Sequence, residues 1–137
     1  VTLKKDMDYT VSYSANKGIG TAKVTVTGKG SYTGKITKTF KINPQGQSIS
    51  AKGDKSGKKI AVTLAKHSSN SGYQVLYADN SGFKNSKSLW LSGNSKNKGT
   101  IKGLKSKKTY YVKARDYKTI GKTKVYGKWS AVKKVSI

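Results

Sequence analysis

The feature that most constrains the fold of this chain is an alternation of apolar and polar residues with a period of two. Residues 102–119, KGLKSKKTYYVKARDYKT, contain seven basic side chains, and such a cluster could be a nucleic-acid-binding patch. Within it, however, Tyr110, Val112 and Ala114 fall on one side of an extended chain, because successive side chains of a strand point to opposite faces. The lysines are therefore predicted to form the solvent side of a half-buried β-strand.

The same alternation recurs through most of the sequence and predicts further strands. These strands are expected within residues 9–13, 22–26, 35–42, 58–66, 73–80, 88–93, 99–104, 110–117 and 128–137. The composition favours Thr, Ser, Val, Tyr and Gly and contains no glutamate, which is typical of strands and turns rather than of long helices. We therefore expect an all-β protein. The roughly six or seven short strands in the second part of the chain indicate a β-sandwich.

A short linker divides this pattern into two parts. The segment NPQGQ, residues 43–47, contains the only proline of the chain and interrupts the alternation. A length of 137 residues is sufficient for two small β domains. We therefore predict a small partial β module over residues 1–43 and a β-sandwich over residues 44–137.

The net charge of +24 predicts attraction to polyanions. The basic residues are 28 lysines and a single arginine, Arg115. Because sequence-reading proteins favour arginine for bidentate contacts with bases and phosphates, this bias argues against specific nucleic-acid recognition. The expected partners are anionic polysaccharides, teichoic-acid-type polymers and host glycans or proteins. Any binding of nucleic acid is expected to be non-specific.

Several kinds of segment and site are missing from the sequence. Cysteine is absent, which excludes disulfides and thiolate metal sites and fits either a cytosolic protein or an exported bacterial one. No run of about 20 apolar residues predicts insertion into a membrane, and no signal peptide is recognisable. The sequence begins and ends within the alternating pattern, so we interpret it as part of a longer polypeptide.

Catalytic and metal-binding chemistry is poorly supported. His67 is the only histidine, and both Cys and Glu are absent, so a catalytic triad would depend on one loop histidine. The aspartates are interpreted as turn or strand-edge residues, because a calcium site needs about six to eight oxygen ligands. They are Asp6, Asp8, Asp54, Asp79 and Asp116. We predict no catalytic residues, no metal ligands and no cofactor.

Residues 44–137 resemble a fibronectin type III domain of the lysine-rich kind found in surface proteins of Gram-positive anaerobes. The segments that carry the resemblance are SGYQVLY (71–77), YYVKARDY (110–117) and YGKWSAVKKVSI (126–137). The resemblance implies an immunoglobulin-like or fibronectin type III β-sandwich.

The same resemblance implies structural roles for several aromatic and aliphatic residues. Leu104 and Tyr110 resemble the tyrosine corner that fixes one connection of such sandwiches, and Tyr73 belongs to an inward strand face. One position departs from the family pattern, because such domains usually have tryptophan where this chain has Leu64. We expect Trp129 to compensate in part for the smaller core.

Residues 1–43 resemble the C-terminal half of a bacterial immunoglobulin-like repeat. The string DYTVSY…GTAKVTVTGKGSYTG…TFKI carries this resemblance. Because the family unit is roughly twice as long, an open strand edge is available to pair with a neighbouring chain. Together the two resemblances imply a non-catalytic segment of an extracellular protein, either on the bacterial cell surface or secreted, that serves in spacing or adhesion.

The candidate ligand-binding residues lie on the predicted outer face of the sandwich. If the strands within residues 73–80, 88–93 and 110–117 are neighbours, as in fibronectin type III sheets, their outward side chains line up. These side chains are Gln74, Leu76, Trp90, Tyr111, Lys113 and Arg115. Aromatic rings flanked by cations suit sugars, anionic glycans or a protein partner. The alternative of similar weight is that Trp90 folds over the sheet edge or packs on the adjacent module.

Three functions therefore remain open from the sequence. The first is a spacer or adhesion segment attracted electrostatically to anionic cell-wall or host polymers. The second is a specific carbohydrate- or host-protein-binding module that uses the exposed face. The third, a charge-driven nucleic-acid binder, is the least favoured. Charge-driven binding should weaken steeply with salt, whereas stacking or apolar recognition should not.

Overall fold

The computed structural model describes residues 2–14 and 18–137, and every regular element in these ranges is a β-strand. The chain divides into two compact units, residues 1–43 and 44–137. The expected all-β architecture is confirmed. Among the described residues, no helix has the length and apolar character needed to cross a membrane.

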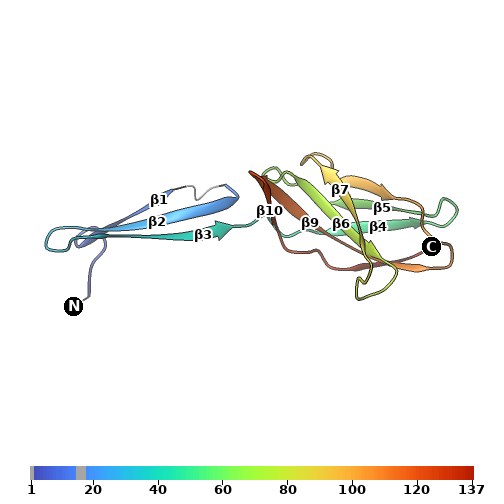
Figure 1. The fold of residues 1–137 in the computed structure, drawn as a ribbon, viewed down its shortest axis with the longest axis horizontal. Coiled ribbons are helices and arrows are strands. Elements are labelled where there is room, and N and C mark those ends of the chain that lie inside the picture. The colour runs from blue at the N-terminus through green and yellow to red at the C-terminus, as the bar shows by residue number, and fades with distance from the viewer. Residues whose placement is uncertain (1, 15–17) are drawn as a thin grey trace. The chain divides into compact units, whose positions relative to one another are not determined.

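The first unit is a three-stranded antiparallel sheet. Its strands are β1 (Tyr9–Ser14), β2 (Gly20–Gly28) and β3 (Lys35–Ile42), in the order β1-β2-β3 (Figure 1). The register places Val11 opposite Val26 and Val26 opposite Ile36, so the apolar residues of all three strands share one face. The opposite face carries Thr, Ser and Lys side chains.

This apolar face has no second layer among the described residues of the unit. Tyr13 and Ile36 are each 61% exposed, and Phe40 is 41% exposed, although all three lie on the apolar side of the sheet. A β-sheet with one apolar face normally buries that face against another layer. The unit therefore presents a core-like surface to solvent.

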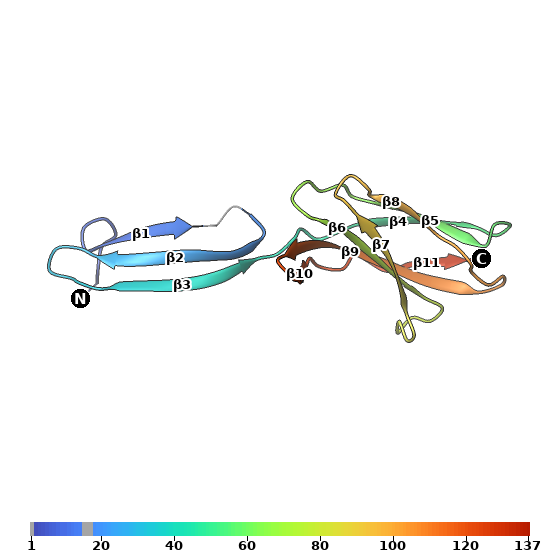
Figure 2. The same cartoon turned by 45° about the horizontal axis from the view of Figure 1, so that its top comes forward.

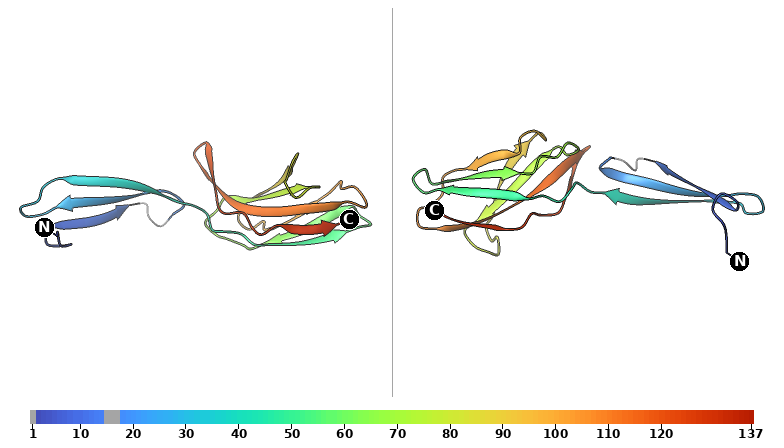
Figure 3. Two further views of the ribbon diagram at one scale, coloured as in Figure 1. Left: turned by 90° about the horizontal axis from the view of Figure 1, so that it is seen from below. Right: turned by 180° about the vertical axis from the view of Figure 1, so that it is seen from behind.

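The second unit consists of two antiparallel sheets. One contains β4 (Ile49–Asp54), β5 (Lys59–Leu64) and β8 (Lys98–Ile101), in the order β4-β5-β8. The other contains β6 (Gly72–Ala78), β7 (Lys87–Ser92), β9 (Thr109–Ile120), β10 (Thr123–Tyr126) and β11 (Lys133–Ser136). Its order is β10-β9-β6-β7, with β11 also paired to β9. Figure 2 labels the strands of both sheets, and Figure 3 shows the two layers from further directions.

The core of the second unit lies between these sheets. Side chains at alternate positions fill it, including Ile60 and Val62 from β5, Tyr73 and Val75 from β6, and Val112 from β9, all essentially inaccessible to solvent. In each of these strands, the face that the alternation predicts to be buried is the face that points toward the core. Burial of such apolar side chains is the main stabilising contribution to a small sandwich of this kind.

Two strands and several boundaries differ from the expectation. β4 and β10 were not predicted, and the strand expected within residues 128–137 covers only Lys133–Ser136. In β4 the inward positions after Ile49 are Ala51 and Gly53, which give a weak apolar signal. Gly53 is required there, because a Cβ atom would lie 2.8 Å from Val135 Cγ1 and 3.2 Å from Ile137 Cδ1.

Trp129 does not fill the core as expected. The core cluster and the side chains packed against it include Leu64 but not Trp129. The indole ring instead lies over the cationic groups of Lys113 and Arg115, whose side chains belong to the outer face of β9. The expected compensation at Leu64 is therefore wrong, because the ring is bound on the opposite side of the sheet.

Candidate functional site

The register of the larger sheet aligns the predicted outward residues across three strands. Gln74 of β6 lies opposite Trp90 of β7 on one side and opposite Arg115 of β9 on the other. Leu76 lies opposite Lys113. Since directly opposed residues of an antiparallel pair share a face, these side chains form two adjacent rows on the outer surface.

Hydrogen bonds fix the orientation of the central row. Arg115 Nε donates to Gln74 Oε1 at 2.8 Å, and Gln74 Nε2 donates to Ser88 Oγ at 3.0 Å. Gln74 is buried, so both ends of its amide are satisfied without solvent. The guanidinium of Arg115 is therefore held in place by its Nε, which leaves its terminal nitrogens for other contacts.

Arg115 and Lys113 are stacked between aromatic rings. The Arg115 Cζ atom lies 3.6 Å from the ring centroid of Tyr126 and 4.1 Å from that of Trp129. Lys113 Nζ lies 4.4 Å from the centroid of Phe83 and 4.7 Å from that of Trp129. All four distances are within the range of a cation–π attraction. The order of groups is thus ring, lysine, ring, arginine, ring.

Partial burial within this stack affects the titration of Arg115. Desolvation lowers the pKa of its guanidinium below its ordinary value, and the neighbouring Tyr126 opposes that shift. Arginine nevertheless stays protonated in proteins. The face therefore carries a permanent charge with reduced hydration, which makes a direct contact with an anion less costly than at a fully hydrated lysine.

Trp90 belongs to a second, smaller aromatic contact. Its ring centroid lies 5.5 Å from that of Tyr117 with an interplanar angle of 78°, an edge-to-face arrangement. Lys124 Nζ lies 5.6 Å from the Trp90 centroid and 5.9 Å from that of Tyr117. Trp90 still leaves 45% of its surface exposed. Trp90 thus has a packing contact at one edge and an open surface elsewhere, and its role in ligand binding remains a prediction.

Phe83 reaches this surface from a strained loop between β6 and β7. Its φ angle is +54°, and Asn85 has a φ angle of +53°, a region that non-glycine residues seldom occupy. The loop is closed by Asn80, whose Nδ2 donates to the Lys84 carbonyl at 2.9 Å and whose Oδ1 accepts from Lys84 N at 2.8 Å. Backbone strain of this kind persists where surrounding structure enforces it, and it is common at functional sites.

We call these rings and cations together the cation–aromatic face. Its members are Phe83, Trp90, Lys113, Arg115, Tyr117, Lys124, Tyr126 and Trp129. Three of the residues predicted from the sequence, Trp90, Lys113 and Arg115, belong to it. Leu76 and Tyr111 are half-buried on the same side of the sheet, outside the ring contacts described above.

Sequence reasoning missed five members of this face. Lys124 and Tyr126 belong to β10, which was not predicted, and Phe83 and Trp129 lie in connections that return over the sheet. Tyr117 has the outward parity of Arg115, so the alternation on β9 was a signal that could have included it. The loop residues had no such signal, because a local period says nothing about where a connection folds.

The residues expected to be structural are buried at other points of the sandwich. Leu104, Tyr73 and Tyr110 belong to the core, and the hydroxyl of Tyr110 accepts a hydrogen bond from Lys105 N at 2.8 Å. The Tyr73 hydroxyl donates to the Asn94 carbonyl at 2.6 Å. Each buried phenol is thus bonded to the backbone of a loop.

Asp116 corrects one sequence interpretation. It is not a turn or strand-edge residue but is fully buried on the inner side of β9. Its Oδ2 lies 2.5 Å from Nδ1 of His67, and its Oδ1 accepts a hydrogen bond from Gln47 Nε2 at 2.7 Å. A buried carboxylate needs such partners, so this cluster joins three distant segments. Its contacts are those of a structural clamp.

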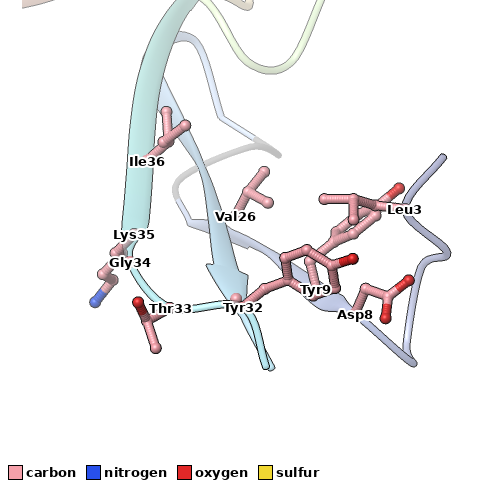
Figure 4. A pocket seen from close by; sticks show the side chains of 10 residues that line it. Leu3, Asp8, Tyr9, Val26, Tyr32, Thr33, Gly34, Lys35 and Ile36 are labelled. Carbon is pink, nitrogen blue, oxygen red and sulfur yellow. The ribbon is translucent and has the colours of Figure 1, made fainter. Parts of the chain in front are cut away.

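The uncovered face of the first unit is hollowed at one end. A groove of about 510 Å³ is lined by Leu3, Tyr9, Tyr32, Val26 and Ile36, together with shorter and polar residues. Figure 4 shows the Leu3 side chain and the two tyrosine rings gathered at this end of the sheet. Its walls are mainly apolar, so the groove extends the exposed core-like surface of β1-β2-β3.

Among residues 2–14 and 18–137, no group of three potential His, Cys, Asp or Glu ligands is close enough to hold a metal ion. The expected absence of metal ligands and cofactors remains a prediction.

Comparison with known proteins agrees on the fold. No family model and no curated protein sequence matches the chain. Among solved structures, the FN1–FN3 domains of chicken CNTN1 are similar, with a TM-score of 0.59 and 17% sequence identity. The alignment covers 88% of this chain and 44% of that chain. The protein has a fibronectin type III-like β-sandwich fold. The expected fold class is thereby confirmed, whereas bacterial origin and an immunoglobulin-like repeat remain predictions.

Proposed function

We propose that this chain is a non-catalytic module of a bacterial cell-surface or secreted protein, and that it binds anionic polysaccharide through the cation–aromatic face. The observation that carries the proposal is the stack of Phe83, Lys113, Trp129, Arg115 and Tyr126 on one surface of the larger sheet. Rings and cations on one surface match a ligand that has both sugar faces and acidic groups.

The geometry supports recognition rather than general attraction alone. The rings hold Lys113 and Arg115 in defined positions, and Gln74 holds the guanidinium of Arg115 at 2.8 Å. Side chains that are ordered before binding lose less conformational entropy when a ligand arrives. The half-exposed Trp90 supplies an aromatic surface beside them. The net charge of +24 adds long-range attraction for polyanions such as teichoic-acid-type polymers or acidic host glycans.

The test is binding to anionic and neutral polysaccharides at two salt concentrations. Calorimetry with a uronic-acid polymer and with its uncharged counterpart should give measurable affinity for the charged polymer at about 50 mM salt. That affinity should persist in part at about 200 mM, because stacking is not screened. Equal binding to duplex DNA, abolished at the higher salt, would instead favour the non-specific nucleic-acid alternative.

A specific host-protein partner is the second candidate function. The observation that favours it is the exposure of Trp90, which leaves 45% of its surface accessible on the strand next to the one that carries the half-buried Leu76. Tryptophan is enriched at the hot spots of protein-binding surfaces. A protein array probed at about 200 mM salt separates the two functions. A protein ligand whose binding depends on Trp90, without any polysaccharide binding, would replace the first proposal.

For residues 1–43 we propose pairing with a neighbouring polypeptide. β1 and β3 are the edge strands of the three-stranded sheet, and the apolar face between them is exposed. An exposed edge offers unpaired backbone groups to another strand. The three lysines of β3, residues 35, 38 and 41, discourage self-association of that edge, so pairing through β1 is the more favourable arrangement.

A further inference from the structure

The geometry points to a second site: a lysine-lined cavity at one end of the sandwich that binds a compact anion carrying two negative charges, such as a phosphate monoester or a sulfate. The cavity lies where β6 ends, β7 begins and the connection before β9 passes over the core. It shares no residue with the cation–aromatic face.

Three lysines from two different segments line the cavity. Lys87 is the first residue of β7, whereas Lys102 and Lys105 belong to the connection between β8 and β9. Among the residues that the structure describes, no salt bridge joins any of the three to a carboxylate. Like charges gathered without a counter-ion repel one another, and an anion placed among them relieves that repulsion.

The one carboxylate of the cavity is already neutralised. Asp79 Oδ2 accepts a hydrogen bond from Lys108 Nζ at 2.7 Å. This contact lowers the pKa of Asp79 below 3.8 and raises the pKa of Lys108 above 10.5. Both groups are therefore charged near neutral pH and cancel each other. The net charge of the cavity is therefore positive and comes from Lys87, Lys102 and Lys105.

Tyr110 brings a buried hydroxyl group close to the backbone of Lys105, which also lines the cavity. Its side chain lines the cavity, although the residue is only 7% exposed, and its hydroxyl oxygen accepts the hydrogen bond from Lys105 N at 2.8 Å. That bond uses a lone pair of the oxygen and leaves the O–H proton. Among the described residues, no acceptor is paired with that proton. An oxyanion in the cavity would accept it, which completes the hydrogen bonding of a buried hydroxyl.

The size of the cavity limits the ligand. Its volume of about 300 Å³ is roughly ten times the share of liquid volume taken by one water molecule. That space holds one phosphate or sulfate group with part of its carrier, and it does not admit a nucleic-acid helix. Lysine acts as a point charge toward such groups and does not require the planar geometry that arginine imposes.

The test is a titration of the ¹⁵N-labelled chain near pH 7, followed by the amide resonances of residues 102–105. Inorganic phosphate and sulfate should shift these resonances saturably, whereas chloride at equal ionic strength should not. Dimethyl phosphate, which carries one negative charge, should bind at least threefold more weakly. If it binds as tightly as inorganic phosphate, or if shifts spread evenly over the lysine-rich surface, the proposed site is wrong.

Three variants decide whether the cavity itself is responsible. Lys102→Gln should weaken phosphate binding by threefold or more, and Asp79→Asn should strengthen it, because Lys108 then adds to the positive charge. Lys52→Gln removes an exposed lysine of β4, outside the cavity, and should leave the affinity unchanged. Equal weakening by Lys52→Gln and Lys102→Gln would assign the effect to net charge and overturn the proposal.

Discussion

Nδ1 of His67 lies 2.5 Å from Oδ2 of Asp116, although the two residues are 49 positions apart in the sequence. Gln47 closes the cluster on its other side: its Nε2 donates to Asp116 Oδ1 and to the Ala65 carbonyl, and its Oε1 accepts from Ala65 N. One buried carboxylate thus ties the entry to β4, the connection after β5 and the middle of β9.

Removing the charge of Asp116 should destabilise the second unit. Asp116→Asn keeps the shape of the side chain. It replaces one carboxylate oxygen, either the one that faces His67 or the one that faces Gln47, with an amide NH2 group. Hydrogen bonds to charged groups contribute about 2 kcal/mol each, so the free energy of unfolding should fall by about that amount. The melting temperature measured by calorimetry should fall by about 10 °C for a unit of this size.

The control for this prediction is Asp54→Asn, which changes an exposed turn carboxylate that accepts from Ser56 and Gly57. It should alter the melting temperature far less. If the two variants melt at the same temperature, the buried cluster does not have the structural role assigned to it.

Trp90→Ala should separate binding from stability. The edge-to-face contact with Tyr117 accounts for about 1 kcal/mol, so the loss of unfolding free energy should be of that order. Affinity for an anionic polysaccharide should fall by tenfold or more when measured by calorimetry. Phe40→Ala removes an aromatic side chain of similar exposure from the other unit and should leave that affinity unchanged. A large drop in melting temperature for Trp90→Ala would assign the ring to packing.

Arg115→Lys should show that the guanidinium is needed for its geometry as well as its charge. Lysine keeps the positive charge but has no planar guanidinium. It therefore cannot make the Nε hydrogen bond to Gln74 and the stacking contacts with Tyr126 and Trp129 at the same time. We expect unfolding free energy to fall by about 1 kcal/mol and polysaccharide affinity to fall severalfold at constant net charge. Lys118→Arg is the reverse exchange at a position outside the face. Unchanged affinity in Arg115→Lys would leave charge as the sole determinant.

The Asp79–Lys108 pair predicts a small change of stability at acidic pH. The hydrogen bond from Lys108 lowers the pKa of Asp79 in the folded state. The contribution of Asp79 is therefore present above the ordinary value of 3.8 and is lost as pH falls through the lower folded value. The melting temperatures of the unchanged chain and of Asp79→Asn should differ near neutral pH and converge below about pH 3. Curves that stay parallel throughout the acid range would contradict this linkage.

The open face of the first unit should bind a hydrophobic dye. Anilinonaphthalene sulfonate fluorescence should increase on addition of the folded chain, because Tyr13, Ile36 and Phe40 are exposed together. Ile36→Thr should reduce that signal. Thr37→Ser, on the opposite face of β3, should not. Equal fluorescence in both variants would show that the dye binds elsewhere.

Periodicity found those parts of the fold that depend on neighbours in the sequence. The alternation in β5, β6 and β9 predicts which side chains are buried, because a strand turns every second residue to the same side whatever it packs against. It also places Trp90, Lys113 and Arg115 on one surface once the strand order is known. β4 was missed because Ala51 and Gly53 are too small to make an apolar period visible.

The sequence by itself determined an all-β chain, the inner and outer faces of its main strands, and an excess of positive charge. Tertiary structure alone decided that Phe83 and Trp129 fold back over Lys113, and that Asp116 is buried against His67 and Gln47. The physical reason is that a strand's period is a property of its own backbone. Contacts between distant segments depend instead on which strands pair and on the path of each loop, and a local period specifies neither.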